Sequence, residues 1–317
     1  MSDAATPTEH HHAVQGPGHH GHSHAPTSFG RAFAIGVALN SLYVIAEAAW
    51  GVRANSLALL SDAGHNLGDV LALGLAWMAS RMVRRAPSAR YTYGLRGSSI
   101  LAALTNAVVL LVVTGGIAWA AILRLAHPEP SAGIAVMVVA AIGVTVNGVT
   151  AWMFASGRGR DINVRAAFAH MASDTLVAAG VVVAGAAIYF THWQWLDPMV
   201  SLVIGAIIVA GTWSLLRESL DLALQAVPIG VDRAAVHDYL VGLPGVAEVH
   251  DLHIWGMSTT ETALTAHLVR PGSPIDDAMI HQVCGELKAR FRIDHATLQV
   301  EEGALDHPCH LADAGVV

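Results

Sequence analysis

Charged residues are scarce in this chain. Asp, Glu, Lys and Arg make up 13% of its 317 residues, against about 25% in an ordinary soluble protein. Hydrophobic residues make up 54%, and the mean hydropathy is positive. We therefore expect a polytopic membrane protein with enough length left for a small soluble domain. The formal net charge of −7 and the few basic residues give no sign of a nucleic-acid-binding surface.

Cysteines are scarce as well, and we expect neither a leader peptide nor a nucleotide-binding loop. The two cysteines, Cys284 and Cys309, are too few for a disulfide framework and suit a reducing cytosol. The first residues carry histidines and no apolar core, so we expect the first apolar segment to be an uncleaved membrane helix. No Walker-type Gly-Lys-Ser/Thr loop occurs, which argues against ATP hydrolysis by this chain.

Histidine, in contrast, is abundant, with 19 residues. Residues 1–28 space their histidines with Gly, Pro, Ser and Ala, a composition that predicts a disordered tail that captures metal. An inert or added tail is the alternative. Residues 303–317 are expected to form a second loose tail. The metal-capture candidates in the two tails are His10, His11, His12, His19, His20, His22, His24, His307, Cys309 and His310.

Six apolar segments follow within residues 29–227, and each is long enough to cross a bilayer as a helix. The loops after the second and fourth segments are rich in arginine, whereas the alternate loops are short and poor in Lys and Arg. The positive-inside rule then places both termini in the cytosol. The expected helices cover about 29–51, 56–82, 98–125, 132–155, 164–190 and 197–226.

Two of these segments carry the same pair of ionisable residues. His65 and Asp69 lie in the second segment and His170 and Asp174 in the fifth, each pair on one helical face because its members are four residues apart. Ionisable side chains are costly inside a membrane and usually mark ion or proton pathways. Two imidazoles and two carboxylates form a tetrahedral set for a divalent metal such as zinc. Hydrogen bonds that only hold the helices together are the structural alternative.

Other polar residues interrupt the apolar segments. Asn40 and Glu47 lie seven residues apart on nearly one face of the first segment, which should face the bundle. Asp62 precedes His65 by three residues, and it either orients His65 as a hydrogen-bond acceptor or lines the entry path. Asn147 in the fourth segment is a second candidate for the pathway.

A soluble domain is expected over residues 228–302. Its pattern predicts helices at 231–241 and 274–291 and strands at 246–255, 260–269 and 296–301, with Asp232 as an N-cap. The order α-β-β-α-β favours a small α+β sandwich with its helices on one face of the sheet. A lone strand histidine is more often structural than a ligand. The candidate ligands are His250, His253, His267 and His295, with Asp251 and Glu301 behind them.

Several motifs occur along the chain in a characteristic order. They are Leu57 to Asp69, Tyr93-Gly94-Leu95-Arg96, Asn147, His170 to Asp174, Asp197-Pro198 and His250 to Trp255. In order and spacing the chain resembles the cation diffusion facilitators over nearly its whole length. One departure is that the family's histidine-rich segment often lies between the fourth and fifth helices, whereas here the histidines are N-terminal.

This resemblance implies a homodimer with six transmembrane helices per protomer and a C-terminal ferredoxin-like cytosolic domain, where further metal could bind. The family's transport site maps onto His65, Asp69, His170 and Asp174. Family members with Asp in place of the first histidine tend to accept cadmium as well as zinc, so His65 favours zinc.

The expected function is efflux of a divalent metal. A Zn²⁺/H⁺ antiporter that exports cytosolic zinc by alternating access fits best, with Cd²⁺ and Co²⁺ as further candidate substrates and no organic cofactor. Zinc binds neutral imidazole and ionised carboxylate, so its binding displaces protons. The default location is a bacterial inner membrane.

Three alternatives belong to other classes. A membrane metal sensor would bind zinc without moving it. A bundle enzyme is disfavoured because diiron bundles use Glu and Glu-x-x-His motifs. A channel is disfavoured because a tight four-ligand site opposes fast conduction.

Overall fold

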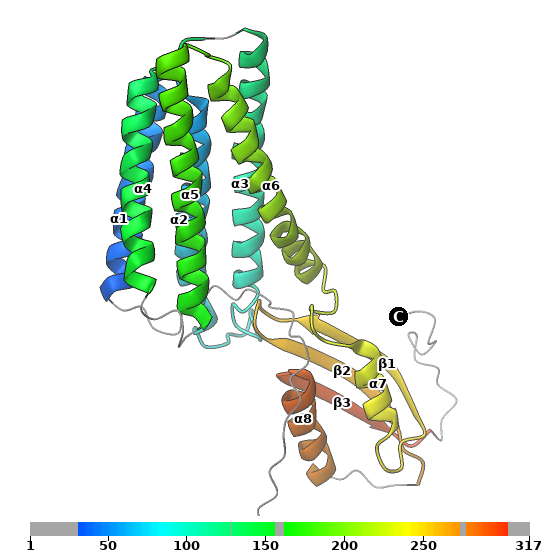
Figure 1. Cartoon of the computed structure of the whole chain (residues 1–317). Helices are drawn as coiled ribbons and strands as arrows, with labels where there is room; N and C mark the ends of the chain where they lie inside the picture. The colour runs from blue at the N-terminus through cyan, green and yellow to red at the C-terminus, as the bar shows by residue number, and fades with distance from the viewer. Residues whose placement is uncertain (1–30, 128, 156–161, 273–276, 304–317) are drawn as a thin grey trace, which may run out of the picture.

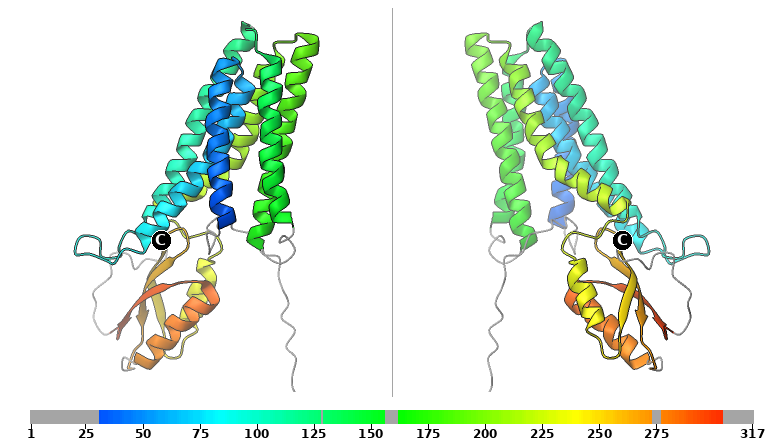
Figure 2. Two further views of the ribbon diagram at one scale, coloured as in Figure 1. Left: turned by 90° about the vertical axis from the view of Figure 1, so that its left-hand side faces the viewer. Right: turned by 90° about the vertical axis from the view of Figure 1, so that its right-hand side faces the viewer.

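The computed structural model describes residues 31–127, 129–155, 162–272 and 277–303. Its chain forms two parts, an upright bundle of long helices and a smaller domain with a three-stranded sheet (Figure 1). Both views in Figure 2 place the smaller domain at the end of the bundle from which the loop after the second helix projects. The division into a helical part and a sheet-containing part agrees with the pattern in the sequence.

The bundle consists of helices that are each 23 to 30 residues long, which is sufficient to span the hydrocarbon core. Four of them, α3 to α6, are apolar enough to qualify as membrane spans by length and composition. Polar residues such as Asp62, His65 and Asp69 interrupt α2. The bounds are α1 Arg31–Arg53, α2 Leu57–Val83, α3 Ser98–Ala126, α4 Gly133–Ala155, α5 Ile162–Thr191 and α6 Leu196–Ala223.

Packing within the bundle is uneven. Helix α4 packs most extensively against α5, and α3 packs against α6, whereas α2 and α5 touch at only a few places. Glycines allow the close α4–α5 approach, because a Cβ added to Gly133 would lie 2.9 Å from the carbonyl oxygen of Gly185. The α2–α5 seam is therefore much less tightly packed than the α4–α5 contact.

One carboxylate organises the end of the bundle that is farther from the sheet domain. Asp197 of α6 accepts hydrogen bonds from Ser56 Oγ at 2.5 Å and from the Leu57 backbone N–H at 2.7 Å. Its Oδ2 also lies 3.5 Å from Nη1 of Arg124 at the end of α3. A negative charge at the N-terminus of α2 is favourable because it interacts with the unpaired N–H groups there. Asp197 thus holds the ends of α2, α3 and α6 together.

The smaller domain has the element order predicted from the sequence. The sheet order is β1-β2-β3, with β1 and β2 antiparallel and β2 and β3 parallel. Asp232 caps α7 as expected, because its carboxylate accepts from the backbone N–H groups of Ala234 and Ala235. The bounds are α7 Arg233–Val241, β1 Glu248–Gly256, β2 Thr262–Val269, α8 Asp277–Phe291 and β3 His295–Glu301.

Both helices of this domain pack against the sheet around one apolar core. Val236 and Leu240 of α7 and Val283 and Leu287 of α8 are almost completely buried. They contact inward-facing strand residues that include Leu264. The covering helices explain the hydrophobic alternation of the strands, since one face packs on the core and the other carries polar side chains.

The two parts meet at the motif that precedes α3. Arg96 Nη1 donates to Glu261 Oε1 at 2.7 Å, and the Thr259 backbone N–H donates to Ser99 Oγ at 3.1 Å. Tyr93 lies edge-on to the ring of His295, with the ring centroids 5.7 Å apart. The stretch Tyr93-Gly94-Leu95-Arg96 therefore contacts the turn between β1 and β2 and the start of β3.

Candidate metal centre

The two His/Asp pairs predicted from the sequence lie together between α2 and α5. His65 Nε2 is 3.2 Å from Asp174 Oδ1. His170 Nε2 is 3.3 Å from Asp69 Oδ2 and 3.6 Å from Asp174 Oδ2. Each histidine thus approaches a carboxylate of the other helix. We call these four residues the α2–α5 quartet.

The spacing of three of the four residues suits one small cation. His65, Asp69 and Asp174 each offer a ligand atom, and these atoms lie within 4.8 Å of one another. The ring of His170 lies edge-on to that of His65, with a centroid distance of 6.4 Å. Tetrahedral zinc with bonds of about 2.0–2.1 Å needs ligand atoms roughly 3.4 Å apart. The His65–Asp174 and His170–Asp69 distances are therefore already close to those that zinc requires.

Burial adds an electrostatic reason for a cation at this place. Asp174 is only 1% exposed. Its Oδ2 and the Oδ2 of Asp69 are buried and accept no hydrogen bond in the described part of the chain. Buried carboxylate oxygens without donors are costly unless a positive charge compensates them. His170 is the most exposed of the four, with 43% of its side chain accessible, so one side of the quartet is open to an incoming ion.

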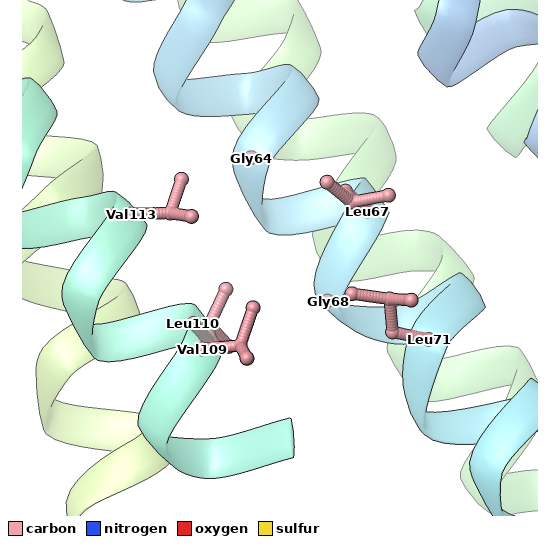
Figure 3. Close-up of a pocket in the computed structure, with 7 residues that line it drawn as sticks. All are labelled: Gly64, Leu67, Gly68, Leu71, Val109, Leu110 and Val113. Atoms are coloured by element: carbon pink, nitrogen blue, oxygen red, sulfur yellow. The ribbon is translucent and has the colours of Figure 1, made fainter. Parts of the chain in front are cut away.

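A small pocket on a neighbouring face of α2 has a different character. It is apolar, lies between α2 and α3, and offers no metal ligand (Figure 3). Gly68 permits the close approach of α3, because a Cβ there would lie 2.8 Å from Leu110 Cδ1. Helix α2 therefore packs on α3 with one face and presents the quartet residues to α5 with another. The pocket is lined by Gly64, Leu67, Gly68, Leu71, Val109, Leu110 and Val113.

A second group of potential ligands lies on the sheet. His250 of β1 and His267 of β2 are paired in the register, and their ring centroids are 5.1 Å apart. Glu301 at the end of β3 places Oε1 2.9 Å from His267 Nδ1 and Oε2 3.6 Å from His250 Nε2. The three residues offer ligand atoms within 4.8 Å of one another. We call them the sheet trio.

Strand register decides which histidines join this group. His253 does not, because a bulge lies between it and His250. Its Nε2 lies 2.6 Å from Asp251 Oδ1, while Asp251 Oδ2 lies 3.3 Å from His267 Nε2. His295 pairs with Ala263 at the opposite end of β3 from Glu301 and lies beside Tyr93. Of the four predicted histidines the structure brings two together, and Glu301 joins them. The parallel β2–β3 pairing that places Glu301 there has no local signal in the sequence.

The remaining candidates fall into two sets. Asp62 and Asn147 are almost completely buried in the bundle. In the described part of the chain no ion pair within 4.0 Å joins Asp62 to His65, whose Nε2 faces Asp174. Cys284 lies on α8, and burial raises the pKa of its thiol. The tail candidates within residues 1–28, and His307, Cys309 and His310, lie outside the described residues.

Comparison with known families decides the class of this protein. The family described as cation efflux transmembrane domain matches residues 33–222, and the family described as cation efflux protein, cytoplasmic domain, matches residues 228–303. The chain belongs to the cation diffusion facilitator family. The resemblance noted from its motifs is thereby confirmed.

Relatives of known name are similar along almost the whole chain. The metal cation efflux system protein CzcD of Cupriavidus metallidurans is 37% identical over 299 residues, which cover 93% of this chain and 92% of the relative. The zinc transporter ZitB of Escherichia coli is 33% identical over 302 residues, covering 93% and 95%. The cadmium, cobalt and zinc/H(+)-K(+) antiporter of Bacillus subtilis is 30% identical over 297 residues, covering 90% and 94%.

Together with the apolar helices, these relationships identify a multi-pass membrane protein for efflux of divalent metal cations. The family is one of transporters and not of enzymes. The expected substrates, zinc with cadmium and cobalt, agree with the metals in the relatives' names.

Proposed function

We propose that this protein exports zinc from the cytosol in exchange for protons, with the α2–α5 quartet as the transport site. The observation that carries this proposal is the interleaving of the two His/Asp pairs. His65 approaches Asp174 at 3.2 Å, and His170 approaches Asp69 at 3.3 Å. Two imidazole nitrogens and two carboxylate oxygens suit zinc, a borderline-soft cation that favours tetrahedral sites.

Proton exchange follows from the chemistry of these ligands. Zinc binds only neutral imidazole and ionised carboxylate, so loading the quartet expels whatever protons it holds. A site open to a more acidic outer side takes up protons there and releases its zinc. A proton gradient can therefore drive zinc outward without ATP. The name of the Bacillus subtilis relative, an H(+)-K(+) antiporter, supports this exchange.

The position of the quartet suits alternating access. It lies across the α2–α5 seam, where the two helices contact each other sparingly, while α5 packs tightly on α4. A shift of the α4–α5 pair relative to α2 would change the distances between the ligand pairs without breaking a large interface. The same shift would open the site toward one side of the membrane and close it toward the other.

We further propose six membrane spans, α1 to α6, with both termini in the cytosol of a bacterial cell and efflux across its inner membrane. The arginine-rich loop between α2 and α3 lies next to the sheet domain, which the positive-inside rule assigns to the cytosolic side. In this assignment residues 29–227 form the membrane domain and 228–302 a ferredoxin-like cytosolic domain. Residues 1–28 and 303–317 are tails.

Dimerisation belongs to the same proposal. The chain acts as a homodimer, and zinc at the sheet trio tightens the contact between cytosolic domains. Supporting this, the trio lies on the sheet face that the helices α7 and α8 leave uncovered. Zinc that changes neither the dimer affinity nor the domain spacing would contradict this part.

Zinc uptake into proteoliposomes tests the function. Purified protein is reconstituted, zinc is added outside at equal or unequal pH, and the parent is compared with Asp174→Ala. We expect uptake that requires the pH difference and disappears in the variant. Full uptake by Asp174→Ala would move the transport site elsewhere. Zinc binding without flux by the parent, in vesicles proven tight, would make the protein a metal sensor.

A further inference from the structure

A second polar cluster lies between α1 and α2, away from the α5 side of the quartet. Tyr43 Oη donates to Glu47 Oε1 at 2.7 Å, and Asn66 Nδ2 donates to Glu47 Oε2 at 3.3 Å. The carboxyl group of Asp62 lies within hydrogen-bonding reach of Glu47. Glu47 is 0% exposed and Asp62 is 1% exposed. Two buried carboxyl groups therefore face each other in the bundle, and we call them the carboxyl pair.

Several buried polar atoms in and near the carboxyl pair, and farther along α1 and α4, have no partner. In the described part of the chain, Asp62 Oδ2, Asn66 Oδ1 and Asn40 Oδ1 are buried and make no hydrogen bond. Asn147 of α4 is fully buried, and neither its Nδ2 nor its Oδ1 has a partner. Helix α4 reaches the cluster because Gly143, one turn before Asn147, leaves room for the Tyr43 hydroxyl. The unpartnered oxygens of Asp62 and Asn66 next to Glu47 indicate a site built for more than helix packing.

The carboxyl pair does not carry two negative charges while its two side chains face each other, as they do in this conformation. Two facing carboxylates repel each other, and burial removes the water that would screen them. Within the described ranges, no ion pair joins an arginine or a lysine to either carboxyl group. Tyr43 on α1 contacts Glu47, and His65 on α2 and Asp174 on α5 act on Asp62 electrostatically from a greater distance, whereas α4 contains no titratable residue. A proton between the two side chains removes the repulsion and supplies the donor that Asp62 Oδ2 lacks.

The pair is separate from the α2–α5 quartet. Glu47 is on α1, which contributes nothing to the quartet, and its hydrogen bonds go to Tyr43 and Asn66. Among the described residues, no ion pair within 4.0 Å joins Asp62 to His65 or His170. Asn66 follows His65 directly in α2, so any movement of α2 that changes the quartet also changes the surroundings of Glu47. The cluster is thus mechanically linked to the quartet without sharing its ligands.

We propose that Glu47 and Asp62 form a proton-binding site, distinct from the metal site, which carries one proton per transport cycle. The proposal rests on the proposed exchange of zinc for protons and adds a carrier to it. The pair takes up its proton from the acidic outer side in a conformation in which the two side chains face each other, and releases it to the cytosol in one that moves them apart. Both steps interconvert a carboxylate and a carboxylic acid, with water as the proton donor or acceptor, and no bond between heavy atoms changes.

The test is the zinc gradient that a fixed pH difference sustains in proteoliposomes at zero membrane potential. Each proton exchanged per zinc multiplies that equilibrium gradient about tenfold for each pH unit. Glu47→Gln keeps the size and the hydrogen-bonding capacity of the side chain but carries no exchangeable charge. We expect it to lower the sustained gradient about tenfold per pH unit, with the affinity for zinc unchanged. Thr212→Val on α6, also buried, is the matched control and should behave like the parent.

A gradient that stays the same in Glu47→Gln, whether transport is slower or not, would overturn the proposal and leave the pair a structural contact. If Glu47→Gln does not fold, Asp62→Asn serves instead, since it also removes the shared proton.

Infrared spectroscopy of the parent at neutral pH provides a second readout. The carbonyl band of a protonated carboxylic acid should be present, should persist in Asp174→Ala and should vanish in Glu47→Gln. Its absence from the parent would equally overturn the proposal. Failure of the parent to sustain any gradient would refute the proposed antiport, while the infrared band would still decide whether the pair holds a proton.

Discussion

The α2–α5 quartet and the sheet trio use the same ligand chemistry on two very different supports. Both combine imidazole nitrogens with carboxylate oxygens, and ligand atoms lie within 4.8 Å of one another in the trio and in three members of the quartet, His65, Asp69 and Asp174. The quartet lies across a seam where α2 and α5 touch at few places. The trio lies on hydrogen-bonded strands backed by the core around Leu264 and Leu287. A site on a loose seam can open and close, whereas a site on a rigid sheet can only fill and empty.

This difference assigns the two groups different roles under the proposed function. The quartet would change its geometry during each cycle, so its affinity would alternate. The trio would keep its geometry, so its occupancy would follow the cytosolic zinc concentration. The contact of Arg96 with Glu261 lies between the two and joins the membrane domain to the turn after β1.

The largest expected effect comes from breaking the quartet at its most exposed member. His170→Ala should reduce zinc uptake about 100-fold or more. Removing a residue that only hydrogen-bonds to a metal ligand already lowers metal affinity or activity by about 10- to 100-fold, and removing a ligand should lower it at least as much. The effect should be large although the His170 side chain is partly exposed, because its ring lies 3.3 Å from Asp69 Oδ2. Initial rates of zinc uptake in proteoliposomes measure the effect.

His127→Ala, at an exposed position after α3, is the matched control and should keep the parent rate. Uptake by His170→Ala close to that of the parent would reduce the quartet to three working ligands.

A smaller effect on transport is expected from the trio. His267→Ala should remove one zinc from the cytosolic domain, because it takes away the central member of the group. The rate of uptake at saturating zinc should change by less than about threefold, as for a substitution away from the transport site. Equilibrium dialysis gives the number of bound zinc ions, and flux assays give the rate. A loss of transport as severe as that of His170→Ala would erase the distinction between the two groups.

Within the sheet domain, Glu301 is a proposed zinc ligand, whereas His295 is a histidine outside the trio. Glu301→Gln should weaken zinc binding at the trio by about 10- to 100-fold, since its carboxylate lies 2.9 Å from His267 Nδ1. His295→Ala should leave this affinity unchanged, because His295 lies at the other end of β3. Isothermal titration calorimetry on protein with a disabled quartet measures both. Equal losses in the two variants would mean that zinc binds elsewhere on the sheet.

The smallest effect is expected at the junction of the two parts. The Arg96–Glu261 ion pair is partly exposed, with 37% and 29% of the two side chains accessible, so it should contribute less than about 1 kcal/mol. Arg96→Ala should leave the protein folded and raise hydrogen exchange at Thr259, whose amide donates to Ser99. Unchanged exchange there would show that the contact does not order the turn.

Much of this arrangement could be predicted from local sequence patterns. The bounds of α1 to α6 follow apolar runs, and the quartet follows from pairs four residues apart on two helices. Helical periodicity alone determines that the two members of a pair share a face. The order of helices and strands in the sheet domain, and the N-cap at Asp232, could also be predicted from the sequence.

What escaped prediction depends on contacts between distant segments. Glu301 was named only behind the four histidines, but the β1 bulge turns His253 away and the parallel pairing of β3 brings Glu301, not His295, to His267. Glu47 was expected to face the bundle, but its partners Tyr43 and Asn66 depend on how α1 packs on α2. The hydrogen bond from Ser56 to Asp197 joins residues 141 positions apart, and no local sequence pattern predicts it.

The most direct test of the quartet is X-ray absorption at the zinc edge. The protein should comprise residues 29–303 with His250→Ala and His267→Ala, so that neither the tails nor the trio can bind metal. We predict one bound zinc with two imidazole and two carboxylate ligands at about 2.0–2.1 Å. A zinc ion with one imidazole, or no bound zinc in a protein that still transports it, would contradict the assignment of His65, Asp69, His170 and Asp174 as the transport site.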